Sequence, residues 1–102
     1  MATKQAPCLA KNLHHVGIAV KDLDAVVAFY SEVFGVAVAK SEEVASQKVR
    51  AVLIPVGGSN LEFLAATSPD STIARFIENR GEGLHHICLE VEDIEAALAE
   101  LR

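Results

Sequence analysis

Apolar and polar residues alternate along several short stretches of the chain, many of them rich in β-branched side chains, which is typical of half-buried strands. This alternation predicts five strands: Leu13–Val20, Val36–Lys40, Val49–Val56, Asn60–Ala65 and Leu84–Val91. Between the second and the third of these strands, the polar stretch Glu42–Lys48 predicts a loop. The glycines and serine that follow Val56 predict a hairpin turn.

Apolar residues that recur every three or four positions predict three helices. The first begins after Asp22 or Asp24, a residue type that caps helix N-termini, and it ends at Gly35. The other two cover Ser71–Asn79 and Asp93–Leu101. The first part of the chain therefore has the order βαβββ, and the predicted fold class is α+β.

An internal repeat links the two ends of the chain. The segment LHHVGIAVKDLDAVVAFY, which begins at Leu13, aligns with LHHICLEVEDIEAALAEL, which begins at Leu84, and seven of 18 positions are identical. The repeat predicts two copies of one βαβββ module. The first copy covers about residues 13–66 and is followed by a helix, whereas the second is represented by its first strand and helix. We therefore expect a single domain over residues 1–102 whose second module is truncated after about residue 102.

Composition and charge exclude several classes of protein. Hydrophobic residues make up 51% of the chain and charged residues 23%, which is typical of a globular domain. A net charge of −5 without a basic stripe argues against nucleic-acid binding. No apolar run approaches the length needed to cross a bilayer, and Met1–Asn12 lacks the apolar core of a signal peptide. We therefore expect a cytoplasmic protein of bacterial type, with no membrane partner.

The two histidine-bearing strands carry a face of small residues. Alternation places His15 with Gly17 and Ala19, opposite the aliphatic side chains that the following helix has to cover. In the second copy His86 takes the equivalent position beside Cys88, which we expect to be a small buried residue. Both imidazoles should then point away from the helices, into a space that the small residues leave open.

Two equivalent histidines, one from each copy, suit a metal ion. Glu62 on the fourth predicted strand is a third candidate donor, which gives a set of His15, Glu62 and His86. The alternative is that these are ordinary strand residues, either hydrogen-bonded or exposed. His14 and His85 also repeat, and for them we favour a strand-edge or helix-packing position over ligation. We expect Glu42 and Glu43 to form a solvated loop edge, and Cys8 needs no role.

Four segments of the chain resemble a known family: LHHVGIAVKDLDAVVAFYSEVFG, EEVASQKVRAVLI, NLEFL and SPDSTIARFIENRGEGLHHICLEVEDIEAAL. They look like the methylmalonyl-CoA epimerases of the vicinal oxygen chelate (glyoxalase/bleomycin resistance/dioxygenase-like) superfamily. The resemblance covers about Asn12 to Arg102, which corresponds to the first two-thirds of a typical member, so the chain looks C-terminally incomplete.

This resemblance implies paired βαβββ modules that form a cup around a divalent metal ion such as cobalt, manganese or zinc. It implies an isomerase that takes an acyl-CoA substrate and epimerises methylmalonyl-CoA at C2, by metal-assisted removal and return of a proton through an enolate. The family ligands map onto His15, Glu62 and His86, in agreement with the argument from strand faces.

Two departures from the family pattern bear on catalysis. The fourth ligand of the family is a Glu on the last strand of the second module, beyond the end of this sequence. Where the family usually has a catalytic Glu, this chain has Ser46, and a serine hydroxyl does not remove an α-proton at neutral pH without a base of its own. The catalytic residue is therefore unassigned, with Glu43 as one substitute.

Two other readings of the sequence stay open. The chain can be a lyase or dioxygenase of the same superfamily that acts on another small substrate, or a non-catalytic, inactive module that binds a ligand or a partner. In each case the strand Leu84–Val91 has an edge without an in-chain neighbour. Such edges recruit strands from other chains, so we expect a homodimer, with strand swapping as one form of it.

Overall fold

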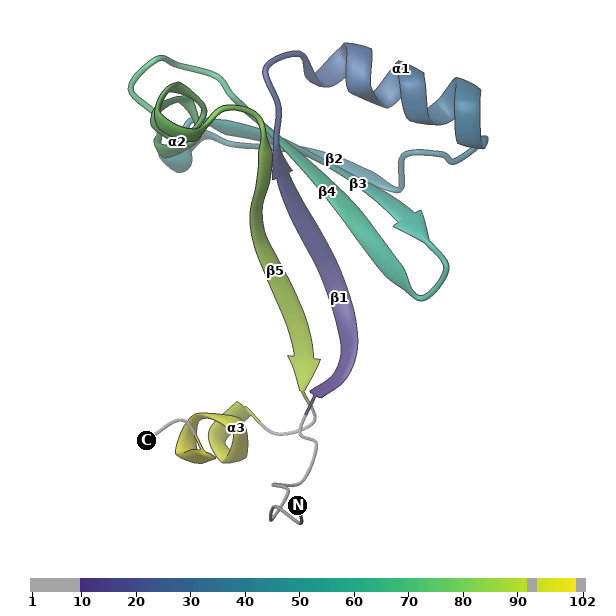
Figure 1. Cartoon of the computed structure of the whole chain (residues 1–102), viewed down its shortest axis with the longest axis vertical. Coiled ribbons are helices and arrows are strands. Elements are labelled where there is room, and N and C mark those ends of the chain that lie inside the picture. Colours follow the sequence, from purple (N-terminus) through teal and green to yellow (C-terminus); the bar gives the residue numbers. More distant parts are fainter. Residues whose placement is uncertain (1–9, 92–93, 101–102) are drawn as a thin grey trace, which may run out of the picture.

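The computed structural model describes residues 10–91 and 94–100 of the chain (Figure 1). In chain order the elements are β1 (Ala10–Ala19), α1 (Leu23–Phe34), β2 (Lys40–Val44), the 3₁₀ helix η1 (Ala45–Gln47), β3 (Val49–Val56), β4 (Ser59–Ala66), α2 (Thr72–Arg80), β5 (Gly83–Val91) and α3 (Ile94–Glu100). The predicted α+β class and the βαβββ order of the first module are confirmed.

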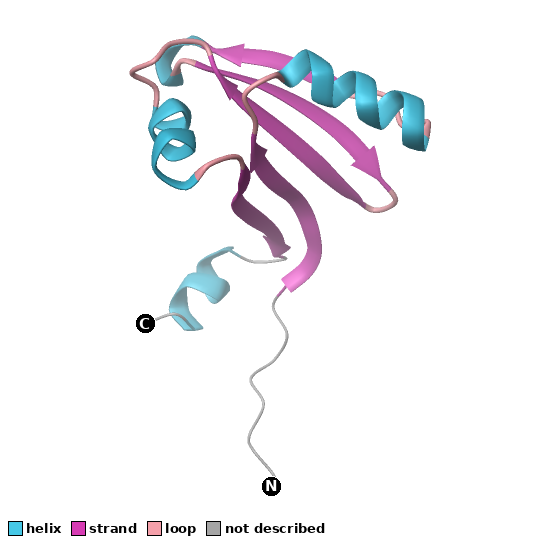
Figure 2. Ribbon diagram, turned by 45° about the horizontal axis from the view of Figure 1, so that its top comes forward, coloured by secondary structure: helices cyan, strands magenta, loops and turns pink. Residues whose placement is uncertain are grey.

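The strands form one sheet in the order β2-β3-β4-β1-β5. β1 pairs with β4 in parallel and with β5 antiparallel, so the first strands of the two repeats lie side by side. A parallel pair needs a crossover, and the segment from α1 to β3 supplies it. β1 and β5 run together past the other three strands, as Figure 2 shows.

Helix α1 packs on one face of the sheet. Its core cluster joins Leu23 to Val52, Ile54 and Phe63 of the central strands. Asp22 caps the helix, because its carboxylate accepts a hydrogen bond of 3.0 Å from the backbone N–H of Ala25. At the other end Gly35 adopts the left-handed conformation at φ 68°, as predicted for a C-terminal cap.

Helix α2 packs on the opposite face of the same sheet. Its Ile73 lies in a second core cluster with Ala19, Ala51 and Leu64, which alternate along the strands with the residues under α1. Ser71, only 3% exposed, caps this helix by accepting a hydrogen bond of 3.0 Å from the N–H of Ala74. α2 lies at one end of this face (Figure 1), and a cavity farther along it is lined by residues that include His15, Ala51 and Glu62.

Two predictions about the segment before β3 are wrong. Residues 36–39 form no strand, and the strand instead covers Lys40–Val44, where we expected a loop. The remainder of that expected loop contains the 3₁₀ helix η1. The reason is that β2 is a polar edge strand, exposed at four of its five residues. Pairing with β3 makes it a strand, and local hydrophobicity gives no sign of that pairing.

The third predicted helix is present, but it does not cover β5 as expected. Ile87 and Leu89 on the aliphatic face of β5 remain 57% and 52% exposed. In Figure 1, α3 lies beyond the end of β5 rather than over its face. Cys8, and the predicted helix ends Asp93 and Leu101, lie outside the described residues. None of the helices in the described part of the chain is long and apolar enough to span a membrane.

Candidate metal centre

The three predicted ligands come from three adjacent strands, β4, β1 and the edge strand β5. Gly17 of β1 is the register partner of Glu62 on β4 and of His86 on β5. His15 lies two positions before Gly17, so its side chain emerges on the same face. This is the face opposite α1, as the small-residue pattern predicted, and the structure brings all three side chains together there.

Their donor atoms form a compact triangle. The Nε2 atoms of His15 and His86 lie 3.1 Å apart. Glu62 Oε1 lies 3.6 Å from Nε2 of His15 and 3.5 Å from Nε2 of His86. A point equidistant from three atoms separated by 3.1, 3.5 and 3.6 Å lies about 2.0 Å from each of them, and this is roughly the bond length between first-row divalent metals and His nitrogen or carboxylate oxygen. The side chains present therefore fit a divalent metal ion.

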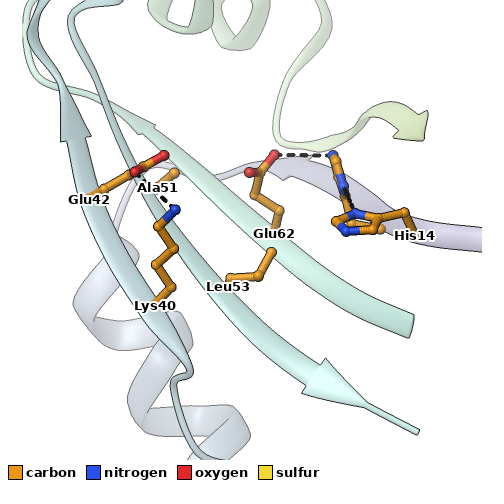
Figure 3. A pocket seen from close by; sticks show the side chains of 7 residues that line it. His14, Lys40, Glu42, Ala51, Leu53 and Glu62 are labelled. Atoms are coloured by element: carbon orange, nitrogen blue, oxygen red, sulfur yellow. Dashed lines mark hydrogen bonds and ion pairs between the residues drawn. The ribbon is translucent and has the colours of Figure 1, made fainter. Parts of the chain in front are cut away.

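The triangle is open on one side. The side chains of His15, Glu62 and His86 are 16%, 23% and 36% exposed. Three protein donors with an accessible outer side are typical of a metal site that also takes water or substrate. Figure 3 shows the cavity next to the triangle, which is lined by His14, His15, Lys40, Glu42, Ala51, Leu53 and Glu62.

Gly17 makes room for one of the imidazoles. A Cβ atom at this position would lie 2.2 Å from Cε1, 2.4 Å from Nδ1 and 2.7 Å from Nε2 of His86. No side chain larger than hydrogen fits while the ring stays in place. The backbone of Gly17 is not in the left-handed region, so the packing of His86 explains the glycine.

Comparison with known proteins identifies the family. Residues 14–102 match the family model described as the Glyoxalase/Bleomycin resistance protein/Dioxygenase superfamily. The chain belongs to this superfamily. The resemblance noted in the sequence, and the α+β fold class of a glyoxalase-like module, are thereby confirmed.

Individual superfamily members show the same likeness. The chain is 38% identical over 91 residues to the mitochondrial methylmalonyl-CoA epimerase of Homo sapiens, covering 88% of this chain and 52% of the human protein. It is 40% identical over 91 residues to the ethylmalonyl-CoA/methylmalonyl-CoA epimerase of Cereibacter sphaeroides, covering 88% of this chain and 68% of that protein. The chain thus spans about half to two-thirds of these relatives.

A solved superfamily structure agrees with these relatives. It is a variant of the Streptomyces coelicolor methylmalonyl-CoA epimerase in complex with 2-nitronate-propionyl-CoA. It superimposes with a TM-score of 0.81 at 34% identity, and the match covers 91% of this chain and 69% of that one.

The structure places the two residues that the sequence analysis discussed as the catalytic base, Ser46 and Glu43, near the edge strand β2. Ser46 lies in η1 and is exposed. A second cavity lies beside the first and shares Glu42, Ala51 and Glu62 with it. Glu43, the substitute considered, lines neither cavity, whereas Glu42 lines both. Glu42 was missed because its segment was predicted to be a solvated loop, and in a strand alternate residues face the sheet's open side. Its Oε2 lies 3.4 Å from Lys40 Nζ.

An ion pair ties the segment after η1 to the turn before α2. The ammonium group of Lys48 donates to the carboxylate of Asp70. This contact, aided by a hydrogen bond from the Ser68 hydroxyl, lowers the pKa of Asp70 from 3.8 to about 2. Gln47, directly before Lys48, lines the second cavity, so the ion pair anchors one wall of it.

Cys88 lies on the same face as the triangle and is half-buried rather than fully buried. It is the register partner of His15. Its Sγ and one ring nitrogen from each of His14 and His15 lie within 4.8 Å of one another. These donors form a second group suited to a metal ion, which shares His15 with the first.

Proposed function

We propose that this chain carries out the epimerisation of methylmalonyl-CoA at C2, as the named activity of its relatives suggests. The observation that carries the proposal is the triangle of donor atoms on the open face of the sheet. A relative of known structure that binds 2-nitronate-propionyl-CoA supports an acyl-CoA ester as the class of substrate.

In this proposal His15, Glu62 and His86 hold a divalent metal ion, with cobalt, manganese and zinc as candidates. The bound ion supplies Lewis-acid stabilisation of the negative charge that develops on the thioester oxygen when the C2 proton leaves. The three side chains hold and orient that ion, and the open side of the triangle admits the substrate oxygens.

We assign the removal of the C2 proton on one face of the substrate to Glu42. Its carboxylate and that of Glu62 are the acidic groups that line the two cavities beside the triangle within the described part of the chain. Glu62 is engaged with the two histidines in this proposal, which leaves Glu42 to accept the proton and become a carboxylic acid. Inversion at C2 is complete when a second acid, which we leave unassigned, delivers a proton to the opposite face of the enolate. Lys40 is placed to pair with the carboxylate form of Glu42.

We also propose that residues 1–102 form a single domain, made of one complete module and the first strand and helix of a second, and that the chain is a homodimer. β5 is the last strand of the sheet, and no described strand covers its outer edge. Leu84, Ile87 and Leu89 of this strand are each more than half exposed. Pairing with a second copy, by strand addition or exchange, buries that apolar surface. Analytical ultracentrifugation tests the proposed dimer. A single monomeric species at all micromolar concentrations would contradict it.

Deuterium incorporation from heavy water into C2 of methylmalonyl-CoA tests the activity, with cobalt or manganese added. Exchange that depends on both the metal ion and Glu42 supports the proposal. The matched control is Glu43→Gln, which changes the neighbouring carboxylate outside the cavities and should leave exchange unaltered. Folded, metal-loaded protein that gives no exchange contradicts epimerisation and favours a module that binds a ligand without turning it over.

A further inference from the structure

We infer that His14 and His85 are positioning residues, each of which holds the neighbouring ligand histidine in the tautomer that leaves Nε2 free to bind metal. The inference rests on the proposed metal site at His15, Glu62 and His86. It does not depend on the proposed epimerase activity.

His14 and His85 are each the extra residue of a β-bulge in the pairing of β1 with β5. Between the register pairs Leu13↔Leu89 and His15↔Cys88, β1 has one extra residue, His14. The extra residue of a bulge leaves the regular alternation and its side chain is re-aimed. For this reason His14 does not lie on the aliphatic face of β1, where strict alternation with Val16 and Ile18 would place it, but lines the cavity together with His15.

The second bulge repeats the first on the other strand. Between the register pairs Gly17↔His86 and Ile18↔Leu84, the extra residue lies on β5 and is His85. The two bulges therefore occur at equivalent positions of the internal repeat, directly before each proposed ligand. Both His14 and His85 are exposed, so neither bulge serves to bury its histidine.

Each bulge brings two Nδ1 atoms into hydrogen-bond contact. Nδ1 of His14 lies 2.8 Å from Nδ1 of His15, and Nδ1 of His85 lies 3.0 Å from Nδ1 of His86. The rings meet edge-on in both pairs, at 78° and 84°. The same contact with nearly the same geometry thus occurs in both halves. His85 is braced further by the ring of Phe76 on α2, at a centroid distance of 4.8 Å.

The chemistry of imidazole gives these contacts a direction. Each Nδ1–Nδ1 contact holds one proton, so one ring donates and the other accepts. When His15 and His86 donate from Nδ1, their Nε2 atoms keep a lone pair, and these are the atoms that face Glu62 in the triangle. Metal-ligating histidines usually donate their other N–H to an acceptor that fixes ring and tautomer. Here the Nδ1 atoms of His14 and His85 are those acceptors.

The test compares two substitutions at each outer histidine. His14→Asn and His85→Asn keep an acceptor oxygen near the place of Nδ1, whereas His14→Leu and His85→Leu remove it. Binding of Zn²⁺ alone is measured by competition with a chromophoric chelator. We expect each Leu variant to bind roughly 10- to 100-fold more weakly, and each Asn variant to stay close to the wild type. Leu84→Ala, an exposed change next to His85 in the β5 bulge, is the matched control for the His85 variants.

Nitrogen-15 NMR of the imidazoles in the Zn²⁺-loaded protein gives a second readout. We expect the Nδ1–H tautomer at both His15 and His86 in the wild type and the Asn variants, and its signature to weaken beside each Leu substitution. Leu variants that bind Zn²⁺ as tightly as the wild type overturn the inference. So does an equal loss of affinity from Cys88→Ser and His14→Leu, because that result makes His14 a ligand in the second donor group.

These results are separable from the fate of the proposed function. Zn²⁺ affinity and tautomer are measured without substrate, so a failure of C2 exchange leaves the positioning inference standing. Conversely, if the protein catalyses C2 exchange but its Leu variants keep full affinity for Zn²⁺, the proposed function stands and the positioning role of His14 and His85 is refuted.

Discussion

Replacement of Gly17 by Ala should abolish tight metal binding while leaving the fold intact. The added Cβ would lie 2.2 Å from Cε1 of His86, and an ordinary van der Waals contact begins at 3.4 Å. The ring must therefore move by more than 1 Å. Metal–ligand bonds tolerate deviations of only about 0.2 Å, so Nε2 of His86 leaves the coordination position.

The expected magnitudes differ strongly between affinity and stability. Loss of one of three protein donors should weaken binding by about 100-fold or more, since disturbing only the partner of a ligand already costs roughly 10- to 100-fold. For the fold, moving the ring off its rotamer costs about 0.5–1.5 kcal/mol, and Ala in a strand recovers roughly 0.5–1 kcal/mol relative to Gly. The free energy of unfolding without metal should thus change by less than about 1 kcal/mol.

Thermal unfolding with and without Zn²⁺ separates the two effects. At a Zn²⁺ concentration about 100 times the wild-type Kd, the wild type gains about 2.7 kcal/mol, whereas a variant with 100-fold weaker binding gains only about 0.4 kcal/mol. Gly58→Ala is the matched control, because its Cβ would meet no atom within 4 Å. Equal Zn²⁺ stabilisation of Gly17→Ala and the wild type would refute the reasoning.

Three further predictions concern the surroundings of the site. Glu42→Gln should lower the rate of metal-dependent C2 exchange by about 100-fold or more and leave the Zn²⁺ affinity unchanged. The reason is that a general base contributes roughly 10²–10⁴-fold to the rate. Equal exchange rates for the variant and the wild type would contradict this assignment. Lys48→Met should raise the pKa of Asp70 from about 2 towards 3.8, measured by carboxyl NMR titration. Because the pKa of Asp70 is lowered in the folded protein, its carboxylate contributes to the free energy of unfolding above pH 3.8. That contribution is lost as the pH falls through about 2. Asp22→Ala should lower the free energy of unfolding, measured with denaturant, by about 1 kcal/mol through loss of the α1 cap. An unchanged free energy of unfolding would contradict the capping role of Asp22.

Local sequence patterns were enough for the elements with strong periodicity. β3 was predicted at its observed bounds. α1 was predicted with Gly35 as its C-terminal cap and with Asp22 or Asp24 as its N-terminal cap, and the cap is Asp22. In these places hydrophobic spacing and capping residues agree with the tertiary environment. β2 was not predicted, because an exposed edge strand is held by backbone pairing with β3 and carries no apolar pattern.

The sequence by itself determined the internal repeat, and with it the equivalence of His15 and His86 on a face of small residues. Only the tertiary structure decided that Glu62 completes the triangle, because its place beside Gly17 depends on the β1–β4 register.

The positions of His14 and His85 were likewise decided by the tertiary structure, through bulges in the β1–β5 pairing. The physical reason is that alternation describes one strand at a time. Register and bulges are properties of two strands, and they belong to contacts between residues far apart in the chain.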